Sequence, residues 1–254
     1  MTKNAVIYGG GGAIGTAVAA ALAKQGVRVH LLGRTRATLD AAAAGIENAE
    51  VAVVDVLDEA AVTAHAESVV ERFGSLDVSL NVATRGDVQG MPLTAISVED
   101  FLAPAVGGLR GNFITGRTAA RLMAAQGSGV IIMLNSGSGH AGSPMMGGTG
   151  PADASLDSLV RNLAIENGPA GVRALGVWVA GIPETLSSAK LGAVNPEMGS
   201  PEALQGVLAH LDSLRMTKRS PRLAEVAETV AFLASDHARG VTGTFVNVTG
   251  GMFS

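Results

Sequence analysis

Short apolar runs rich in β-branched residues alternate with alanine-rich stretches along almost the whole chain of 254 residues. Seven runs are predicted to be strands: 4–9, 27–32, 49–55, 76–83, 129–136, 172–180 and 244–250. Between them, the spacing of apolar residues predicts helices at 14–25, 36–44, 58–72, 99–125, 153–167 and 223–235. Continuous apolar strands that alternate with helices form a parallel sheet covered on both faces. The pattern therefore predicts an α/β fold with a doubly wound parallel sheet of about seven strands.

Length, charge and cysteine content narrow the class of protein. A chain of this length closes one large core, so we expect a single domain over residues 1–254. The formal charge is −4, and the short run RMTKRSPR near position 220 is too small to be a nucleic-acid footprint. The chain has no cysteine, which excludes disulfides and thiolate chemistry, and we predict no metal site. With no leader and no apolar span, we expect a soluble, cytoplasmic protein with no membrane partner.

One segment departs from the alternation. Residues 181–222 are rich in Gly, Pro and Ser around a predicted helix at 201–214. Long insertions of this kind in α/β domains are often lids over a substrate, although an ordinary surface loop without a function has the same composition. We predict a substrate lid here and leave the surface alternative open.

The glycine-rich stretch VIYGGGGAIGTAVAAALAKQG at 6–26 follows the first strand directly and opens an apolar helix. Gly9 permits a tight turn, and the glycines at 10–12 let backbone amides approach a phosphate. Gly15 lets the helix pack close to the strand while the helix N-terminus faces the anion. This context predicts a dinucleotide site on a Rossmann-type sheet.

The end of the second strand selects between cofactors. An NAD site places a carboxylate here for the ribose 2′-hydroxyl, whereas an NADP site places a cation for the 2′-phosphate. The chain has Gly33 and Arg34, with Arg36 two residues on. Guanidinium matches phosphate in charge and geometry, so Arg34 favours NADP(H) over NAD, although a solvated surface arginine remains an alternative.

Over essentially its full length the chain resembles the short-chain dehydrogenase/reductase family. The loop YGGGGAIG at 8–15 is similar to the family's Thr-Gly-x-x-x-Gly-x-Gly, and VDVLD at 54–58 is similar to its adenine-contacting segment. NVAT at 81–84 stands where the family has Asn-Asn-Ala-Gly, and AGIPET at 180–185 resembles its nicotinamide-contacting segment. The resemblance implies these cofactor-binding residues: Gly9, Gly11, Gly12, Ile14, Gly15, Arg34, Asp55, Val56, Asn81, Ala83, Gly181 and Thr185.

The family's chemistry uses four side chains, and the resemblance places them on Ser136, Thr149, Asp153 and Gly108. The serine is retained, but Thr149 replaces the tyrosine acid/base, Asp153 its lysine partner, and Gly108 the asparagine that orders a water. An aliphatic hydroxyl ionises far above a phenol, and an aspartate reverses the charge that tunes it. We predict a degenerate tetrad that does not reduce an ordinary ketone in the usual way.

A structural interpretation of the same residues uses no chemistry. TGPADAS at 149–155 is typical of a helix start, with Gly150 at the cap, Pro151 at the first helical position and Asp153 in the first turn.

Another side chain is a candidate to replace the tyrosine. His140 lies four residues after Ser136 and has a pKa suited to proton transfer, although a loop histidine is more often exposed surface. Glu184 and Asp157 are weaker candidates. Four histidines have no partner that the sequence identifies: His30, His65, His210 and His237.

Three functional hypotheses follow. The leading one is a protein of this family that binds NADP(H) but lacks the usual reductase activity and acts as a binding or partner subunit. The second is an active NADP(H)-dependent oxidoreductase of unusual mechanism that uses Ser136 with His140 or a group of the substrate. The third is a nucleotide-independent, lyase-like enzyme, which the retained loop and Arg34 disfavour. The resemblance also implies a homo-dimer or homo-tetramer formed through the helices at 99–125 and 153–167, and a small-molecule ligand.

Overall fold

The computed structural model describes residues 2–142, 144–194 and 196–252, and in these residues seven parallel strands form one sheet. The strand order is β3-β2-β1-β4-β5-β6-β7, and every neighbouring pair is parallel. The strands are β1 (Asn4–Tyr8), β2 (Arg28–Gly33), β3 (Ala49–Val53), β4 (Val78–Asn81), β5 (Gly129–Asn135), β6 (Val172–Trp178) and β7 (Phe245–Asn247). The predicted doubly wound, seven-stranded parallel sheet is confirmed.

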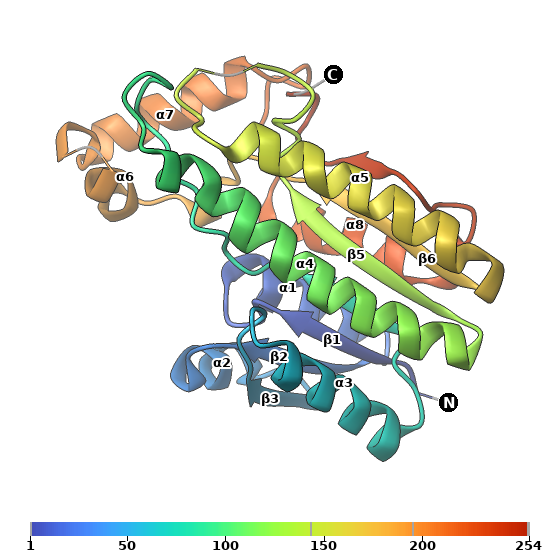
Figure 1. Ribbon diagram of the computed structural model, residues 1–254. Helices are drawn as coiled ribbons and strands as arrows, with labels where there is room; N and C mark the ends of the chain where they lie inside the picture. The colour runs from blue at the N-terminus through green and yellow to red at the C-terminus, as the bar shows by residue number, and fades with distance from the viewer. Residues whose placement is uncertain (1, 143, 195, 253–254) are drawn as a thin grey trace.

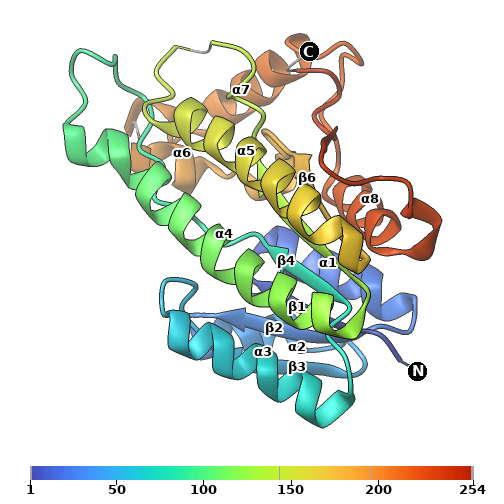
Figure 2. The same ribbon diagram turned by 45° about the vertical axis from the view of Figure 1, so that its right-hand side comes forward.

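Helices cover both faces of the sheet (Figures 1 and 2). One face carries α3 (Glu59–Phe73), α4 (Val98–Gln126) and α5 (Thr149–Asn167), and the other carries α1 (Ala13–Lys24), α2 (Arg36–Ala43) and α8 (Leu223–Ala234). In the part of the chain that the structure describes, none of the helices is long and apolar enough to cross a membrane.

The first strand explains why the strands are apolar throughout instead of alternating. All five residues of β1 are buried. Ile7 packs into the core cluster under α1 and α8, whereas Val6 and Tyr8 pack into the cluster under α3, α4 and α5. Successive side chains of a strand point to opposite faces, so a strand between two helical layers needs apolar residues at every position.

The segment 181–222 forms two helices, α6 (Ser188–Val194) and α7 (Pro201–Ser213), so the predicted helix at 201–214 is confirmed. Both lie beyond one end of the sheet, beside the first turns of α4 and α5 (Figure 1). The fully buried Arg215 joins this segment to the body of the fold. Its guanidinium donates to the carbonyl oxygens of Thr249 (2.9 Å) and Ala180 (2.7 Å), and Ser200 caps the start of α7.

A histidine on β2 is buried between the sheet and α3. His30 is 1% exposed, and neither ring nitrogen has a hydrogen-bond partner among the described residues. Its ring centroid lies 5.3 Å from that of Phe73 and 6.0 Å from that of His65. Burial lowers the pKa of His30 to about 4; Glu50 opposes this shift, while His65, Arg28 and Arg72 add to it.

This burial makes stability depend on pH. The unfolded chain protonates His30 near pH 6.5, whereas the folded chain protonates it only near pH 4. The contribution of His30 to the free energy of unfolding is therefore complete above pH 6.5. As the pH falls to 4 this contribution is lost, and the loss is on the order of 3 kcal/mol. We expect His30→Leu to flatten this part of the pH dependence of the free energy of unfolding, measured by urea titration. The exposed His237→Leu is the control, and an unchanged slope in His30→Leu would contradict the assignment.

Candidate active site

The glycine-rich loop after β1 forms a cradle at the carboxyl end of the sheet. The amides of Gly9 and Gly10 donate to Leu32 O at 2.8 and 2.9 Å, which fixes the loop against β2. Gly9 has a φ of +82°, and a Cβ at Gly15 would lie 2.4 Å from Gly9 O, so neither position accepts a side chain. No side chain among the described residues caps α1, which leaves its first amides available for an anion.

A cavity of about 530 Å³ extends from this cradle along the strand ends. Seven of the predicted cofactor residues line it: Gly9, Gly11, Gly12, Arg34, Asp55, Val56 and Ala83. Arg34 makes no hydrogen bond or ion pair with another described residue, whereas Arg36 is paired with Asp40 at 2.8 Å. A cation without a partner at the end of β2, above an uncapped helix N-terminus, fits a phosphate-bearing dinucleotide.

The other predicted cofactor residues do not line this cavity. Asn81 is buried and accepts the amide of Ala83 at 3.0 Å, so it shapes the loop after β4. Ile14 packs against the core, and Gly15 lies under Gly9. Gly181 and Thr185 follow β6. The last hydrogen bond between β6 and β5 is donated by the amide of Val179 to Asn135 O at 2.8 Å.

The start of α5 differs from the sequence prediction. The helix begins at Thr149 with Gly148 at its cap, so the cap is not Gly150 and Pro151 is the third helical residue. Pro151 is tolerated there because the first amides of a helix have no intrahelical partner. The earlier start places Asp153 in the second turn, facing inward and 0% exposed. Asp153 is therefore not a first-turn residue that compensates the helix dipole.

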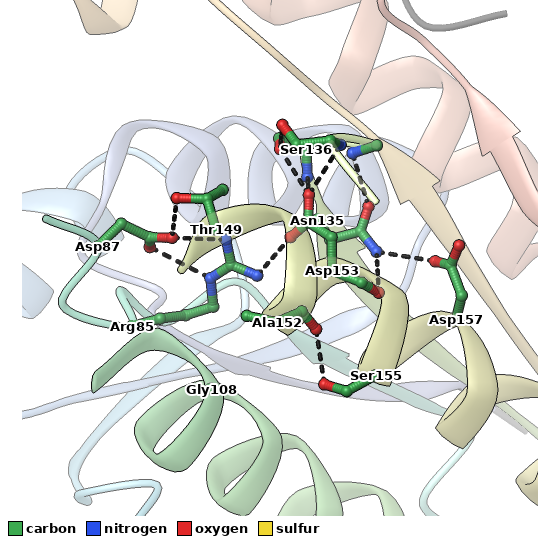
Figure 3. A network of polar contacts seen from close by, with 12 residues as sticks. Arg85, Asp87, Gly108, Asn135, Ser136, Thr149, Ala152, Asp153, Ser155 and Asp157 are labelled. Carbon is green, nitrogen blue, oxygen red and sulfur yellow. Dashed lines mark hydrogen bonds and ion pairs between the residues drawn. The ribbon is translucent and has the colours of Figure 1, made fainter. Parts of the chain in front are cut away.

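Asp153 is the centre of a network of buried polar contacts (Figure 3). Its Oδ2 accepts hydrogen bonds from Ser136 Oγ at 2.5 Å, the Ser136 amide at 3.1 Å and the Ser138 amide at 3.0 Å. Its Oδ1 lies 2.6 Å from Nη1 of Arg85. The retained serine and the aspartate at the lysine position are thus joined directly.

Arg85 is the cation of this site, and it comes from the loop after β4. Its guanidinium binds Asp153 on one side and Asp87 on the other, with Nη2–Oδ1 at 2.8 Å and Nε–Oδ2 at 3.2 Å. Burial lowers the pKa of Arg85, but Asp153 and Asp87 outweigh burial and hold it above its ordinary value. Arg85 is only 11% exposed and stays charged.

Gly108 makes room for this arginine. A Cβ at Gly108 would lie 2.6 Å from Arg85 Cδ and 3.0 Å from Cγ, closer than side chains pack. A Cβ at the neighbouring Gly107 would lie 3.2 Å from Arg85 O. Two glycines of α4, Gly107 and Gly108, thus accommodate the loop after β4. The side chain of Arg85 leaves no room at position 108 for the asparagine of the family.

Both hydroxyl groups at the site donate their proton to a carboxylate. Ser136 Oγ donates to Asp153, and Thr149 Oγ1 donates to Asp87 Oδ1 at 2.9 Å while it accepts from Gln89 at 3.1 Å. A hydroxyl has one proton to donate. The protons of both hydroxyls are therefore committed to carboxylates and are not free for a carbonyl oxygen. Ser136 Oγ also accepts from the Ser138 amide at 3.3 Å and lies 2.6 Å from Ser138 Oγ, so Thr149 Oγ1 is the hydroxyl that keeps a free lone pair.

No tyrosine replaces the missing phenol. The chain has one tyrosine, Tyr8, which ends β1 with 2% exposure in the core under α3, α4 and α5. Burial raises the pKa of Tyr8 further above its ordinary value. A phenol therefore takes no part in proton transfer here.

His140 makes no hydrogen bond to Ser136 among the described residues. Its Nε2 lies 2.5 Å from Asp157 Oδ2, and its ring packs on Trp178 with centroids 4.3 Å apart. Asn135 holds the other oxygen of Asp157 at 2.9 Å. Among the weaker candidates, Glu184 is paired with Arg222 at 2.8 Å. The described residues contain no group of three or more side chains placed to hold a metal ion.

Sequence reasoning missed five members of the network: Arg85, Asp87, Gln89, Asn135 and Ser138. The signal was available in TRGD at 84–87, a charged pair directly after the Asn81 motif at the carboxyl edge of the sheet. The contact of Arg85 with Asp153 joins positions 68 residues apart, which periodicity does not reveal.

The parallel sheet and its glycine cradle define a Rossmann-type fold. A family model described as Enoyl-(Acyl carrier protein) reductase matches residues 11–253. Levodione reductase of Leifsonia aquatica is 32% identical over 255 residues, covering 97% of this chain and 92% of that protein. The 3-oxoacyl-(acyl-carrier-protein) reductase FabG of Staphylococcus aureus is 30% identical, covering 100% and 99%.

Solved structures agree. The crystal structure of levodione reductase has a TM-score of 0.86 at 29% identity, covering 98% of this chain and 96% of that one. The structure of NAD⁺-bound xylitol dehydrogenase has a TM-score of 0.86 at 25% identity, covering 98% of each chain. The chain belongs to the short-chain dehydrogenase/reductase family, a family of NAD(P)-dependent oxidoreductases.

The fit between Gly108 and Arg85 gives a test. We expect Gly108→Ala to lower the free energy of unfolding by about 1–3 kcal/mol, because the added methyl group displaces a pinned side chain. In an Arg85→Ala background the same change should be neutral or stabilising. Gly206→Ala on α7, where a Cβ has nothing within 4 Å, is the matched control and should gain up to about 1 kcal/mol. Additive effects of the two substitutions would contradict the contact.

Proposed function

We propose that this protein is an NADP(H)-dependent oxidoreductase that transfers hydride without the tyrosine and lysine of its family. One observation carries the proposal. The cavity that begins at the intact glycine cradle extends to Arg85, which is paired with Asp153 in a buried, hydrogen-bonded cluster. Buried ion pairs seldom add net stability over apolar residues of the same volume, so stability alone gives weak grounds for such a cluster. The relatives, named as reductases and dehydrogenases, favour turnover as well.

The adenosine end of the cavity supports NADP(H). Arg34 and Asp55 both line it, and Arg34 has no carboxylate partner among the described residues. A 2′-phosphate supplies that partner in a charge-assisted pair, whereas a bare 2′-hydroxyl leaves the guanidinium to water.

At the reacting end, the bound nicotinamide supplies a hydride-transferring carbon, and this chain supplies the surroundings. Gly181 and Thr185 hold the nicotinamide side, and Ser136 Oγ positions the polar group of the substrate. Arg85 pairs with Asp153, and Asp153 fixes Ser136 through two hydrogen bonds and Ser138 through a third. We assign no role in the chemistry to His140, since it is bonded to Asp157. In this proposal α6 and α7 are the lid over the substrate.

A second candidate is a protein that binds NADP(H) without turnover. It is favoured by the absence of a phenol at the site and by the commitment of both hydroxyl protons to carboxylates. A nucleotide-independent lyase is disfavoured because the cradle and Arg34 are retained.

Calorimetric titration of NADPH, followed by a panel of small carbonyl, alcohol and C=N compounds, separates these functions. Saturable binding with oxidation of NADPH by one substrate class, abolished by Ser136→Ala, supports the oxidoreductase. Saturable binding with no turnover of any class supports the second candidate. Absence of binding at millimolar NADPH contradicts both.

Cofactor preference tests Arg34 separately. Arg34→Ala should weaken NADPH binding roughly 10–100-fold and leave NADH binding nearly unchanged, because it removes a charge-assisted bond to the 2′-phosphate. Arg36→Ala is the matched control, since Arg36 is already paired with Asp40. Equal losses for NADPH and NADH would show that Arg34 does not select the cofactor.

We also propose a homo-oligomer formed through α4 and α5. Five apolar side chains form an exposed stripe on one face of α4: Val98, Leu102, Val106, Leu109 and Phe113. Their spacing of three and four residues keeps them on one side of the helix. Ile165 adds an exposed apolar residue on the adjacent α5.

Light scattering after gel filtration tests this interface. Val106→Glu combined with Phe113→Glu should convert the oligomer to a folded monomer, because two charges would be buried without partners. Leu214→Glu, on an exposed residue just after α7, is the control and should leave the mass unchanged. A wild-type monomer, or a double variant of unchanged mass, would contradict the proposal.

A further inference from the structure

We propose that the substrate of this site is a cationic C=N compound, an iminium ion, or in the reverse direction the corresponding amine. This inference rests on the proposed oxidoreductase function and names its substrate class. It follows from two features of the described site: the direction of its hydroxyl hydrogen bonds and the sign of its charge.

The first feature is the lack of a proton donor. Reduction of a carbonyl places negative charge on oxygen, which requires a donor in the transition state. Ser136 Oγ and Thr149 Oγ1 stand at the positions of the family's donors, but their protons are bound to Asp153 and Asp87. Three of the five N–H groups of Arg85 are directed at these two carboxylates.

The second feature is charge. Arg85 faces both Asp87 and Asp153, so the cluster carries a formal excess of one negative charge. Two other charged side chains line the same cavity, Arg34 and Asp55, and their opposite charges leave this excess unchanged. His140 is bound to Asp157, buried Arg215 faces Asp212, and Lys190 is exposed with its Nζ on Thr185 O. Asp87 is 24% exposed, so this part of the cluster is accessible to a substrate.

An iminium ion matches both features. Hydride forms the new C–H bond at the iminium carbon, and the C=N π pair becomes the lone pair of nitrogen. The substrate passes from a cation to a neutral amine, while the nicotinamide passes from neutral to cationic. No proton moves in this step. The positive charge is shared between the two partners throughout, where the negative excess of the cluster stabilises it.

The lone pairs also suit this substrate class. Ser136 Oγ donates to Asp153, so Ser138 Oγ, 2.6 Å away, donates to Ser136. Asp87 and Asp153 accept every hydrogen bond they make with the cluster. These acceptors bind the N–H or the C–H groups beside a cationic nitrogen, and the two hydroxyls offer no proton to a carbonyl oxygen.

The test compares two probes of similar size with the full-length protein and NADPH. N-methyl-3,4-dihydroisoquinolinium is a permanent cation, and α-tetralone is a neutral ketone. We expect kcat/KM for the iminium to exceed that for the ketone by about a hundredfold or more. Turnover of the ketone alone, or of both equally, overturns the inference and leaves the oxidoreductase function standing. Turnover of neither, with NADPH bound, overturns the inference together with that function.

A charge variant separates recognition from folding. Asp87→Asn keeps the size of a partly exposed side chain and removes the excess charge. It should raise KM for the iminium about tenfold and change NADPH affinity little. Glu67→Gln, which removes the carboxylate of an exposed pair with Arg121 at 2.6 Å, is the matched control. An Asp87→Asn protein that folds, as its unfolding temperature shows, and keeps the wild-type KM overturns the charge argument.

Discussion

The ion pair between Arg85 and Asp153 is the contact on which the rest of the site depends. It neutralises a fully buried carboxylate, which then orders Ser136 and Ser138 through their amides and one hydroxyl. Removing one partner of such a pair costs about 3–5 kcal/mol, because the other charge is left buried without compensation. Gly108 makes room for Arg85, and Asp153 pairs with its charge. Both departures from the family pattern therefore have one cause, the presence of this arginine in the site.

Much of the fold was predictable from the sequence. The alternation of apolar runs and alanine-rich stretches determines the sheet, because a strand between two helical layers needs apolar side chains on both sides, as β1 shows. The cradle was predictable as well, since Gly9 and Gly15 occupy positions that exclude a Cβ. Segment ends were less accurate: α5 begins two residues before its expected first residue, Pro151, because proline is accepted anywhere among the first amides of a helix.

The reacting end was not predictable to the same degree. The sequence showed that the tyrosine, lysine and asparagine were replaced, and it suggested that Asp153 was part of a helix start. It did not show that a residue from the loop after β4 enters the site, because that contact spans 68 positions and local patterns carry no information about it. For the same reason His140 was a reasonable candidate from its distance along the chain to Ser136, although its ring binds Asp157, one turn of α5 after Asp153.

The central claim is that hydride moves at this site without coupled proton transfer. Isotope effects on the oxidation of NADPH by the iminium probe test it directly. We predict a primary isotope effect on kcat/KM when NADPH carries deuterium at the transferred position, and no significant effect of replacing water by D₂O. A large solvent isotope effect would show a proton in flight in the rate-limiting step and would contradict this account.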